Sequence, residues 1–318
     1  MKLHGMIEIK VHGERVLRDP GFWDKVRKAL GGTPDLRTNR VRADLHAATL
    51  VEGSRRALGR LGIQNAISLA VDRQVIFEDR QGRPDDLVDL MASFHDNQAV
   101  FGEDFQLLRL VVEHEEAGLH VVIEVLARGE HPQDETAARV VVGGRIRDFE
   151  PRSGESAAEY RARVEPLMAT PAILEAHRAQ FESLVERLAD TLRGTLADAE
   201  IRVREAEAKV EQPTRGVAGP SPALPPTDRR YDPYETYYPS PLPGVLSMMM
   251  WGLMLSWAMM PHYTIVNHAG TPVGATDAIS EGALASAAAG GELSGADGAG
   301  GDMDLGGDMD FDFDFFDW

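Results

Sequence analysis

The sequence predicts an α+β domain at its N-terminal end, an antiparallel-rich sheet with covering helices, followed by regions of very different composition. Three observations lead there: apolar residues alternate in short runs up to residue 150, a long helical pattern follows, and proline then glycine dominate. We therefore divide the chain into an α+β globular domain (1–150), a long α-helical arm (151–211), a Pro-rich linker (212–243), an apolar helix with a short hairpin (244–276) and a disordered acidic tail rich in Gly, Asp and Phe (277–318).

The strands follow from period-two alternation. A polar, glycine-containing turn at 115–118 separates two apolar runs, which predicts a β-hairpin. Apolar residues stand on both faces of these strands, so we expect helices to cover the sheet on at least one side. The predicted strands are residues 4–11, 67–71, 75–77, 105–113, 119–127 and 137–146.

The helices follow from apolar residues recurring every three or four positions. The spacing predicts helices at 20–30, 42–61, 85–94 and 155–167. A last helix begins after Thr170 and Pro171 and is expected to run about forty residues, to Val210. Its approximate 3-4 repeat fits a coiled-coil arm, and it fits equally a long helix packed on its own sheet.

The linker is defined by nine prolines between residues 212 and 243, which favour an extended, polyproline-like chain and forbid a packed helix. We expect it to separate the two halves of the protein. The tail beyond it is rich in Gly, Ala, Ser and Asp and is expected to be disordered when alone.

The most distinctive feature is a charge-free stretch between Thr236 and Thr276, containing the 17-residue apolar segment 244–260. As a helix, that segment would span about 25 Å, short of the roughly 30 Å hydrocarbon core of a bilayer. It therefore predicts a transmembrane or re-entrant helix, a partner-docking or self-assembly segment, or an internal core helix. Its candidate contacts with lipid or a partner are Val245, Leu246, Met249, Met250, Trp251, Leu253, Leu255 and Trp257.

The residues around this segment are compatible with burial of the segment in a membrane and with its burial in a soluble protein. Aromatic residues on either side are potential interfacial anchors, and all basic residues precede the segment, which predicts a cytoplasmic N-terminal half. Residues 263–266 and 271–273, however, resemble a short β-hairpin, which suits a protein surface better than lipid. The candidate anchors are Tyr234, Tyr237, Tyr238, Trp257 and Tyr263.

The tail ends in alternating acidic and aromatic residues after a repeated Gly-Gly-Asp-Met-Asp motif. Such a peptide can add a strand to a sheet edge or lay its aromatics into a groove of a basic partner. A purely solubilising tail and a weak calcium site are the alternatives. The expected contacts with a partner protein are Phe311, Phe313, Phe315, Phe316 and Trp318.

The charge balance narrows the class of partner. All 33 Lys and Arg precede residue 231, and 13 of the 51 acids follow it, so most of the net charge of −18 lies at the C-terminal end. A general nucleic-acid binder is disfavoured because such affinity depends on cationic side chains. The chain has no cysteine, and residues 1–13 lack the apolar run of a signal peptide, so we expect no secretion by that route.

No sequence motif identifies an enzymatic reaction. His114, Glu115, Glu116 and His120 cluster at the predicted hairpin turn, but without the spacing of a helical zinc site, and a solvated turn is the simpler interpretation. His95 with Asp96, and His262 with His268, are equally incomplete. We expect no cofactor and no metal, and an activity without a recognisable motif stays open.

Together these observations predict a non-enzymatic, membrane-associated protein with a cytoplasmic α+β domain and an acidic, aromatic, partner-binding tail. The alternative is a soluble assembly or adaptor protein whose Met-rich segment forms an interface with a partner protein. The same segment would serve as the interface of a homo-oligomer.

Overall fold

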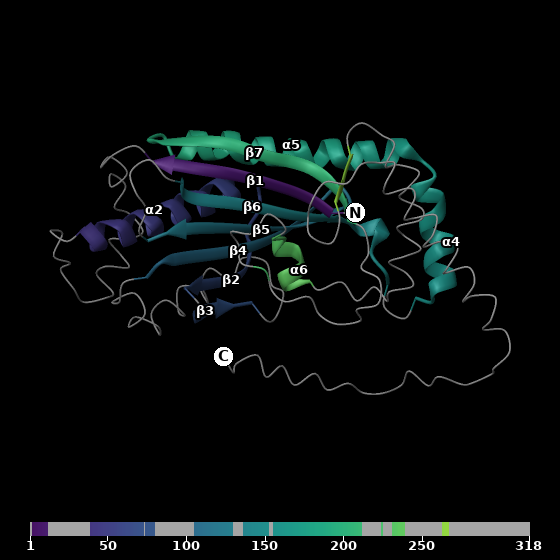
Figure 1. The fold of residues 1–318 in the computed structure, drawn as a ribbon, viewed down its shortest axis with the longest axis horizontal. Helices are drawn as coiled ribbons and strands as arrows, with labels where there is room; N and C mark the ends of the chain where they lie inside the picture. Colours follow the sequence, from purple (N-terminus) through teal and green to yellow (C-terminus); the bar gives the residue numbers. More distant parts are fainter. Residues whose placement is uncertain are drawn as a thin grey trace, which may run out of the picture.

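The computed structural model describes residues 2–11, 39–72, 74–79, 105–129, 136–152, 155–211, 224, 231–238 and 263–266. They form one eight-stranded sheet in the order β3-β2-β4-β5-β6-β1-β7-β8 (Figure 1). All neighbouring pairs are antiparallel except β7 and β8, which are parallel. The strands are β1 (Lys2–Val11), β2 (Asn65–Val71), β3 (Gln74–Glu78), β4 (Leu107–Glu116), β5 (Leu119–Arg128), β6 (Thr136–Ile146), β7 (Ala199–Glu211) and β8 (Tyr263–Val266).

The antiparallel sheet and its covering helices confirm the predicted α+β core. The hairpin of β4 and β5 turns through Ala117 and Gly118, both with positive φ, as a tight two-residue connection requires. The helices are α2 (Asn39–Arg60), α4 (Ala157–Met168), α5 (Pro171–Thr195) and the short α6 (Pro233–Tyr237), with a 3-10 turn at Arg147–Phe149. The predicted helices at 20–30 and 85–94 lie outside the described residues.

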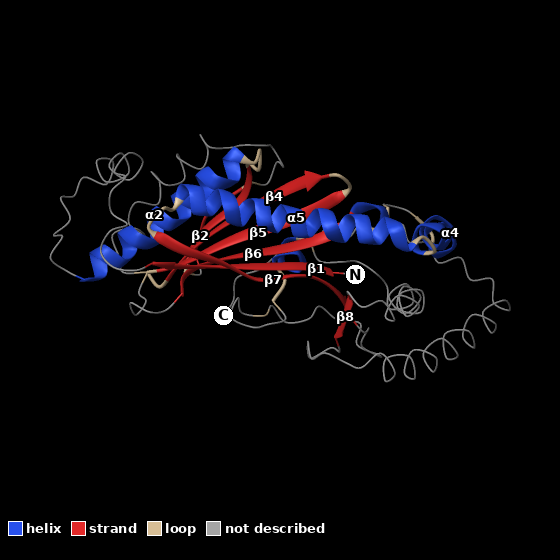
Figure 2. Cartoon of the chain, turned by 90° about the horizontal axis from the view of Figure 1, so that it is seen from above, coloured by secondary structure: helices blue, strands red, loops and turns tan. Residues whose placement is uncertain are grey.

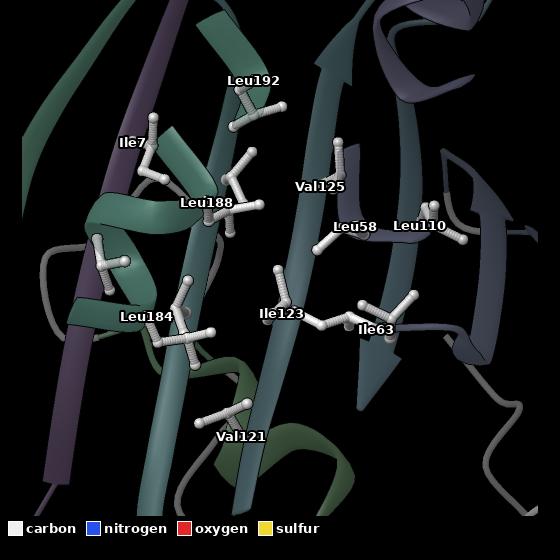
Figure 3. Close-up of a cluster of buried hydrophobic side chains, with 14 of the residues drawn as sticks. Ile7, Leu58, Ile63, Leu110, Val121, Ile123, Val125, Leu184, Leu188 and Leu192 are labelled. Atoms are coloured by element: carbon white, nitrogen blue, oxygen red, sulfur yellow. The ribbon is translucent and has the colours of Figure 1, made fainter. Parts of the chain in front are cut away.

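Helices α2 and α5 lie on the same face of the sheet (Figure 2). The side of α5 that meets the strands carries Leu184, Leu188 and Leu192, all buried. They pack above Ile7 and Ile123, as Figure 3 shows. Each such side chain contributes roughly 1.5–3 kcal/mol when removed from water, so this face holds the main hydrophobic core.

The long helix predicted to reach Val210 is wrong after Thr195. The chain leaves the helix at Leu196 and forms β7, which pairs with β1 over the whole length of β1. Residues rich in Ala, Glu and Lys favour a helix locally, but tertiary pairing overrides that preference. One cross-strand ion pair, between Arg204 Nε and Glu8 Oε2 at 2.6 Å, accompanies the pairing. The remaining helix, α5, packs on its own sheet rather than projecting as an arm.

The linker prediction is also wrong in one part. Residues 231–238, expected to be extended, contain α6 and pack on the sheet, with residues 231–234 buried. Asp232 caps this helix by accepting a hydrogen bond from the Tyr234 amide at 3.0 Å, and Pro233 occupies its first turn. Proline is well suited to that position because its fixed φ matches the helix and its missing N–H has no partner there anyway.

Only the first half of the hairpin predicted after residue 262 falls within the described residues. Tyr263–Val266 is strand β8, but its partner is β7, in parallel register. Residues 271–273, expected to form the second strand of the hairpin, lie outside the described residues.

Candidate functional site: the polar face of the sheet

The face of the sheet opposite α2 and α5, which we call the polar face, carries charged side chains in the middle of the strands. Alternation along β4, β5 and β6 puts them on the side opposite the core residues Leu110, Ile123 and Val142. Buried charges are rare unless they are paired, so their partners show what the face is built for. The charged and polar residues of this face that contact one another or residues 231–238 include Arg109, Glu113, His120, Glu124 and Arg145.

Some of those partners lie on neighbouring strands, such as Asn65 beside Glu113, and the others come from one short segment, residues 231–238, which we call the strap. Tyr231 and Tyr234 are buried at about the level of core residues, with 5% and 4% of their surface exposed. The strap fits because β6 has a glycine beneath it: a Cβ at Gly143 would stand 2.2 Å from Asp232 Oδ1 and 3.0 Å from the Tyr234 amide nitrogen. Any larger residue at Gly143 would therefore displace the strap.

The first cluster of the polar face surrounds Glu124, which is completely buried in β5. The Tyr231 hydroxyl donates a hydrogen bond to Glu124 Oε2, and Arg109 Nη1 lies 3.5 Å from Glu124 Oε1. Burial raises the pKa of Glu124, although both partners oppose that shift. Burial and the adjacent Glu124 carboxylate raise the pKa of Tyr231, so its hydroxyl stays a proton donor.

The second cluster is aromatic and centres on His120. The Tyr234 hydroxyl lies 2.8 Å from His120 Nδ1 and donates to Glu150, so the ring nitrogen is the donor in that contact. His120 Nε2 faces Glu113 Oε2 at 3.4 Å, and the Tyr238 hydroxyl donates to the same oxygen. The imidazole also stacks edge-on against the rings of Tyr234 and Tyr238, with centroids 5.1 and 4.8 Å away.

The third cluster pairs the start of the strap with Arg145. Arg145 Nη2 donates to Asp232 Oδ2 at 2.6 Å and lies 3.4 Å from Glu235 Oε1, while its guanidinium carbon stands 4.6 Å from the centre of the Tyr234 ring. Burial opposes ionisation of Asp232, but the charges of Arg145 and Lys2 and the hydrogen bond from Arg145 together outweigh it, so the pKa of Asp232 is lowered. Lys2 Nζ adds a second contact to Glu235 at 2.6 Å.

This arrangement suits binding better than catalysis. The acids and bases of the three clusters are engaged with the strap, so the polar face holds a peptide by directed hydrogen bonds and ion pairs. Within the described ranges, no group of three or more His, Cys, Asp or Glu side chains is placed to hold a metal ion. Nor does any helix in that part of the chain have the length and apolarity needed to cross a bilayer.

The histidine cluster predicted at the hairpin turn does not converge. His114 and Glu116 lie on the helix-covered side, where Arg187 Nη2 of α5 contacts Glu116 Oε1 at 2.7 Å. His120 points to the polar face, because strand alternation separates it from His114. Glu115 pairs instead with Arg147. His95, Asp96, His262 and His268 lie outside the described residues.

The tyrosines predicted as membrane anchors are used otherwise. Tyr234, Tyr237 and Tyr238 pack with Val111 and Val122 on the polar face, and Tyr263 belongs to the main core. The remaining candidate contacts lie outside the described residues. In the apolar segment they are Val245, Leu246, Met249, Met250, Trp251, Leu253, Leu255 and Trp257, and in the tail they are Phe311, Phe313, Phe315, Phe316 and Trp318.

Sequence reasoning missed the strap as a site, although two signals point to it. Asp232-Pro233 is a helix-start pair inside a Pro-rich stretch, and Tyr231, Tyr234, Tyr237 and Tyr238 gather there. A single acid, Glu124, stands in the otherwise apolar run 121–127 and needs a partner once buried. Neither signal identifies the other, because 106 residues separate Glu124 from Tyr231.

The apolar segment 244–260 is bracketed by two attachments to the sheet. Tyr234 of the strap lies over Gly143 of β6, and Tyr263 of β8 is in register with Ala208, Leu3 and Gly144 across the sheet. Three strand spacings of about 4.8 Å therefore separate Tyr263 from Gly144, or about 14 Å. Both ends of the chain 239–262 are thus held at the same end of one sheet.

Comparison with known proteins adds no relative. No protein-family model, no curated protein and no solved structure matches the chain. The function must be argued from the geometry just described.

Proposed function

We propose that this protein is a non-enzymatic assembly protein, in which the sheet presents the Met-rich segment 244–260 for burial against a second copy of the chain. The observation that carries this proposal is the attachment of both ends of residues 239–262 to one sheet. A segment whose two ends are held at the same end of one sheet suits a protein interface.

Composition favours protein over lipid as the occupant. Helices that lie on a membrane surface typically carry Lys and Arg on their polar face, and this chain has neither after residue 230. Methionine is flexible and polarisable, so it suits adaptable protein contacts. A second copy brings an identical segment, and the two can meet around a two-fold axis. The acidic tail then remains available to bind a basic partner protein.

A replacement experiment tests the proposal. Residues 244–260 of the full chain are exchanged for a flexible Gly-Ser linker of the same length, so that the strap and β8 can both stay in place. We expect the natural chain to form oligomers by light scattering after size exclusion, and the replaced chain to be monomeric. The matched control exchanges residues 283–299 of the tail for the same linker and should stay oligomeric. A natural chain that is monomeric at all concentrations would overturn the proposal.

Membrane association is the second candidate, favoured by the absence of any charged side chain between Thr236 and Thr276. With both flanks attached to the sheet, this mode is a segment that dips into the bilayer and returns. A single crossing would leave the flanks on opposite sides of roughly 30 Å of hydrocarbon. If the segment enters the membrane, the natural chain should remain with membranes after a carbonate wash, and the chain with residues 244–260 replaced should not. The assembly proposal does not predict this result.

A further inference from the structure

The strap is bound to the sheet as a peptide ligand is bound. Apart from the Asp232 cap on the Tyr234 amide and the contact between the Tyr234 and Tyr238 rings, its side chains find their partners outside it, on β1, β4, β5 and β6 and at Glu150. Chain on both sides, residues 212–230 and 239–262, separates it from the strands. Three tyrosine hydroxyls each donate to a different carboxylate of the sheet domain: Tyr231 to Glu124, Tyr234 to Glu150 and Tyr238 to Glu113.

The polar face also recognises the backbone and the acid of the strap. The missing side chain at Gly143 lets Asp232 and the first turn of α6 approach the sheet. Arg145 binds the Asp232 carboxylate and lies over the Tyr234 ring. The polar face therefore recognises an acid at the start of a helix and, on either side of it, tyrosines with neutral hydroxyls.

We propose that the polar face is a peptide-binding site, that the strap is its resident ligand, and that a partner protein displaces the strap with an acidic, tyrosine-bearing turn of the same chemistry. Two tyrosines three residues apart, with an acid directly after the first, define that turn. Phosphorylated tyrosines are rejected, because a phosphate would stand against a carboxylate instead of donating a proton to it. The inference does not depend on what the apolar segment binds.

Competition between strap and partner makes the proposal measurable. A tethered ligand acts at an effective concentration in the millimolar range, so the natural chain should bind an added peptide weakly. The apparent dissociation constant equals the intrinsic one divided by the fraction of molecules with an empty face. Weakening the strap alone must therefore strengthen binding of an added peptide, whereas a residue with only a structural role would give no such gain.

The experiment uses the full chain and a fluorescent peptide with the sequence of residues 229–240, followed by fluorescence anisotropy. The double substitution Tyr231→Phe and Tyr234→Phe weakens the strap and leaves the sheet unchanged. We expect it to lower the apparent dissociation constant at least about tenfold, since each lost hydrogen bond to a charged group has that order of effect. Adding Gly143→Ala to this chain fills the space under the peptide and should abolish the binding.

Matched peptides test the chemistry of recognition. The same peptide with phenylalanine at the positions of Tyr231 and Tyr234, or with phosphotyrosine at the position of Tyr234, is expected to bind at least about tenfold more weakly. Circular dichroism and a thermal melt check that each chain is folded. If the double variant does not fold, Asp232→Asn weakens the strap through its contact with Arg145 and takes its place.

Two results overturn the inference. One is a folded chain with a weakened strap that binds no added peptide at concentrations up to about 1 mM. That value matches the effective concentration of a tethered ligand, so the added peptide should bind measurably there. The other is equal binding of the tyrosine, phenylalanine and phosphotyrosine peptides, which would mean that hydrogen bonds from the tyrosine hydroxyls to the carboxylates do not contribute to recognition.

Discussion

The two faces of the sheet are covered in different ways. On one face, α2 and α5 bury apolar side chains such as Phe181 and Ile123 in a continuous core. On the other, the strap meets charged side chains such as the buried Glu124 and the partly buried Arg145. Hydrophobic burial is non-directional and grows with area, whereas a buried charge is tolerated only with a partner in the right place. The helix-covered face therefore sets stability, and the polar face sets which segment can bind.

The largest expected effect is on the helix-covered face. Phe181→Ala should lower the free energy of unfolding by about 3–5 kcal/mol, because Phe181 is fully buried between α5 and the sheet. Denaturant titration measures it. Glu186→Ala, at an exposed position of the same helix, is the control and should change stability by at most about 0.5 kcal/mol. Equal effects at the two positions would contradict the assignment of the core.

The next effect is on the polar face. Glu124→Ala leaves Arg109 without its buried partner and should cost about 3 kcal/mol, at the low end for such pairs because Arg109 is 23% exposed. Replacing both residues with apolar ones, Glu124→Leu and Arg109→Met, should recover part of that loss, because no uncompensated charge remains while the buried Tyr231 hydroxyl still lacks its acceptor. The same titration measures both. A double variant as unstable as the single one would mean that the pair itself stabilises the sheet.

A smaller effect is expected from one hydroxyl. Tyr234→Phe removes the group that joins His120 to Glu150 while keeping the ring against Arg145. The expected loss is about 1.5 kcal/mol, and the strap should exchange its amide hydrogens faster. Hydrogen exchange of residues 231–238, compared with β5, locates the change. Faster exchange in β5 to the same extent would show that the strap does not open by itself.

The smallest effect is confined to acid pH. Because the pKa of Asp232 is lowered in the folded chain, its ionised form stabilises the fold above its ordinary pKa of 3.8, and that stabilisation is lost as pH falls further. The difference in unfolding free energy between the natural chain and Asp232→Asn should be constant near neutral pH and shrink below about pH 4. A difference that does not depend on pH would argue against the charged pair with Arg145.

The two faces were not equally predictable. The apolar face follows from alternation in runs such as 119–127, where every second residue must share a side, so its strands and the hairpin turn could be predicted locally. The occupant of the polar face could not, because Glu124 and Tyr231 carry no common signal in the sequence. The strand at Ala199–Glu211 was missed for a similar reason: its residues suit a helix, and only β1 makes a strand of them.

The sequence by itself determined the antiparallel α+β core, the helix start at Thr170 and Pro171, and the uneven distribution of charge. These depend on neighbours within a few residues, where periodicity and capping act. The tertiary structure alone decided that β7 joins the sheet, that Tyr231–Tyr238 covers the polar face and that β8 anchors the other side of the apolar segment. Such pairings join residues far apart in the chain, and their energies exist only once the sheet has brought the partners together.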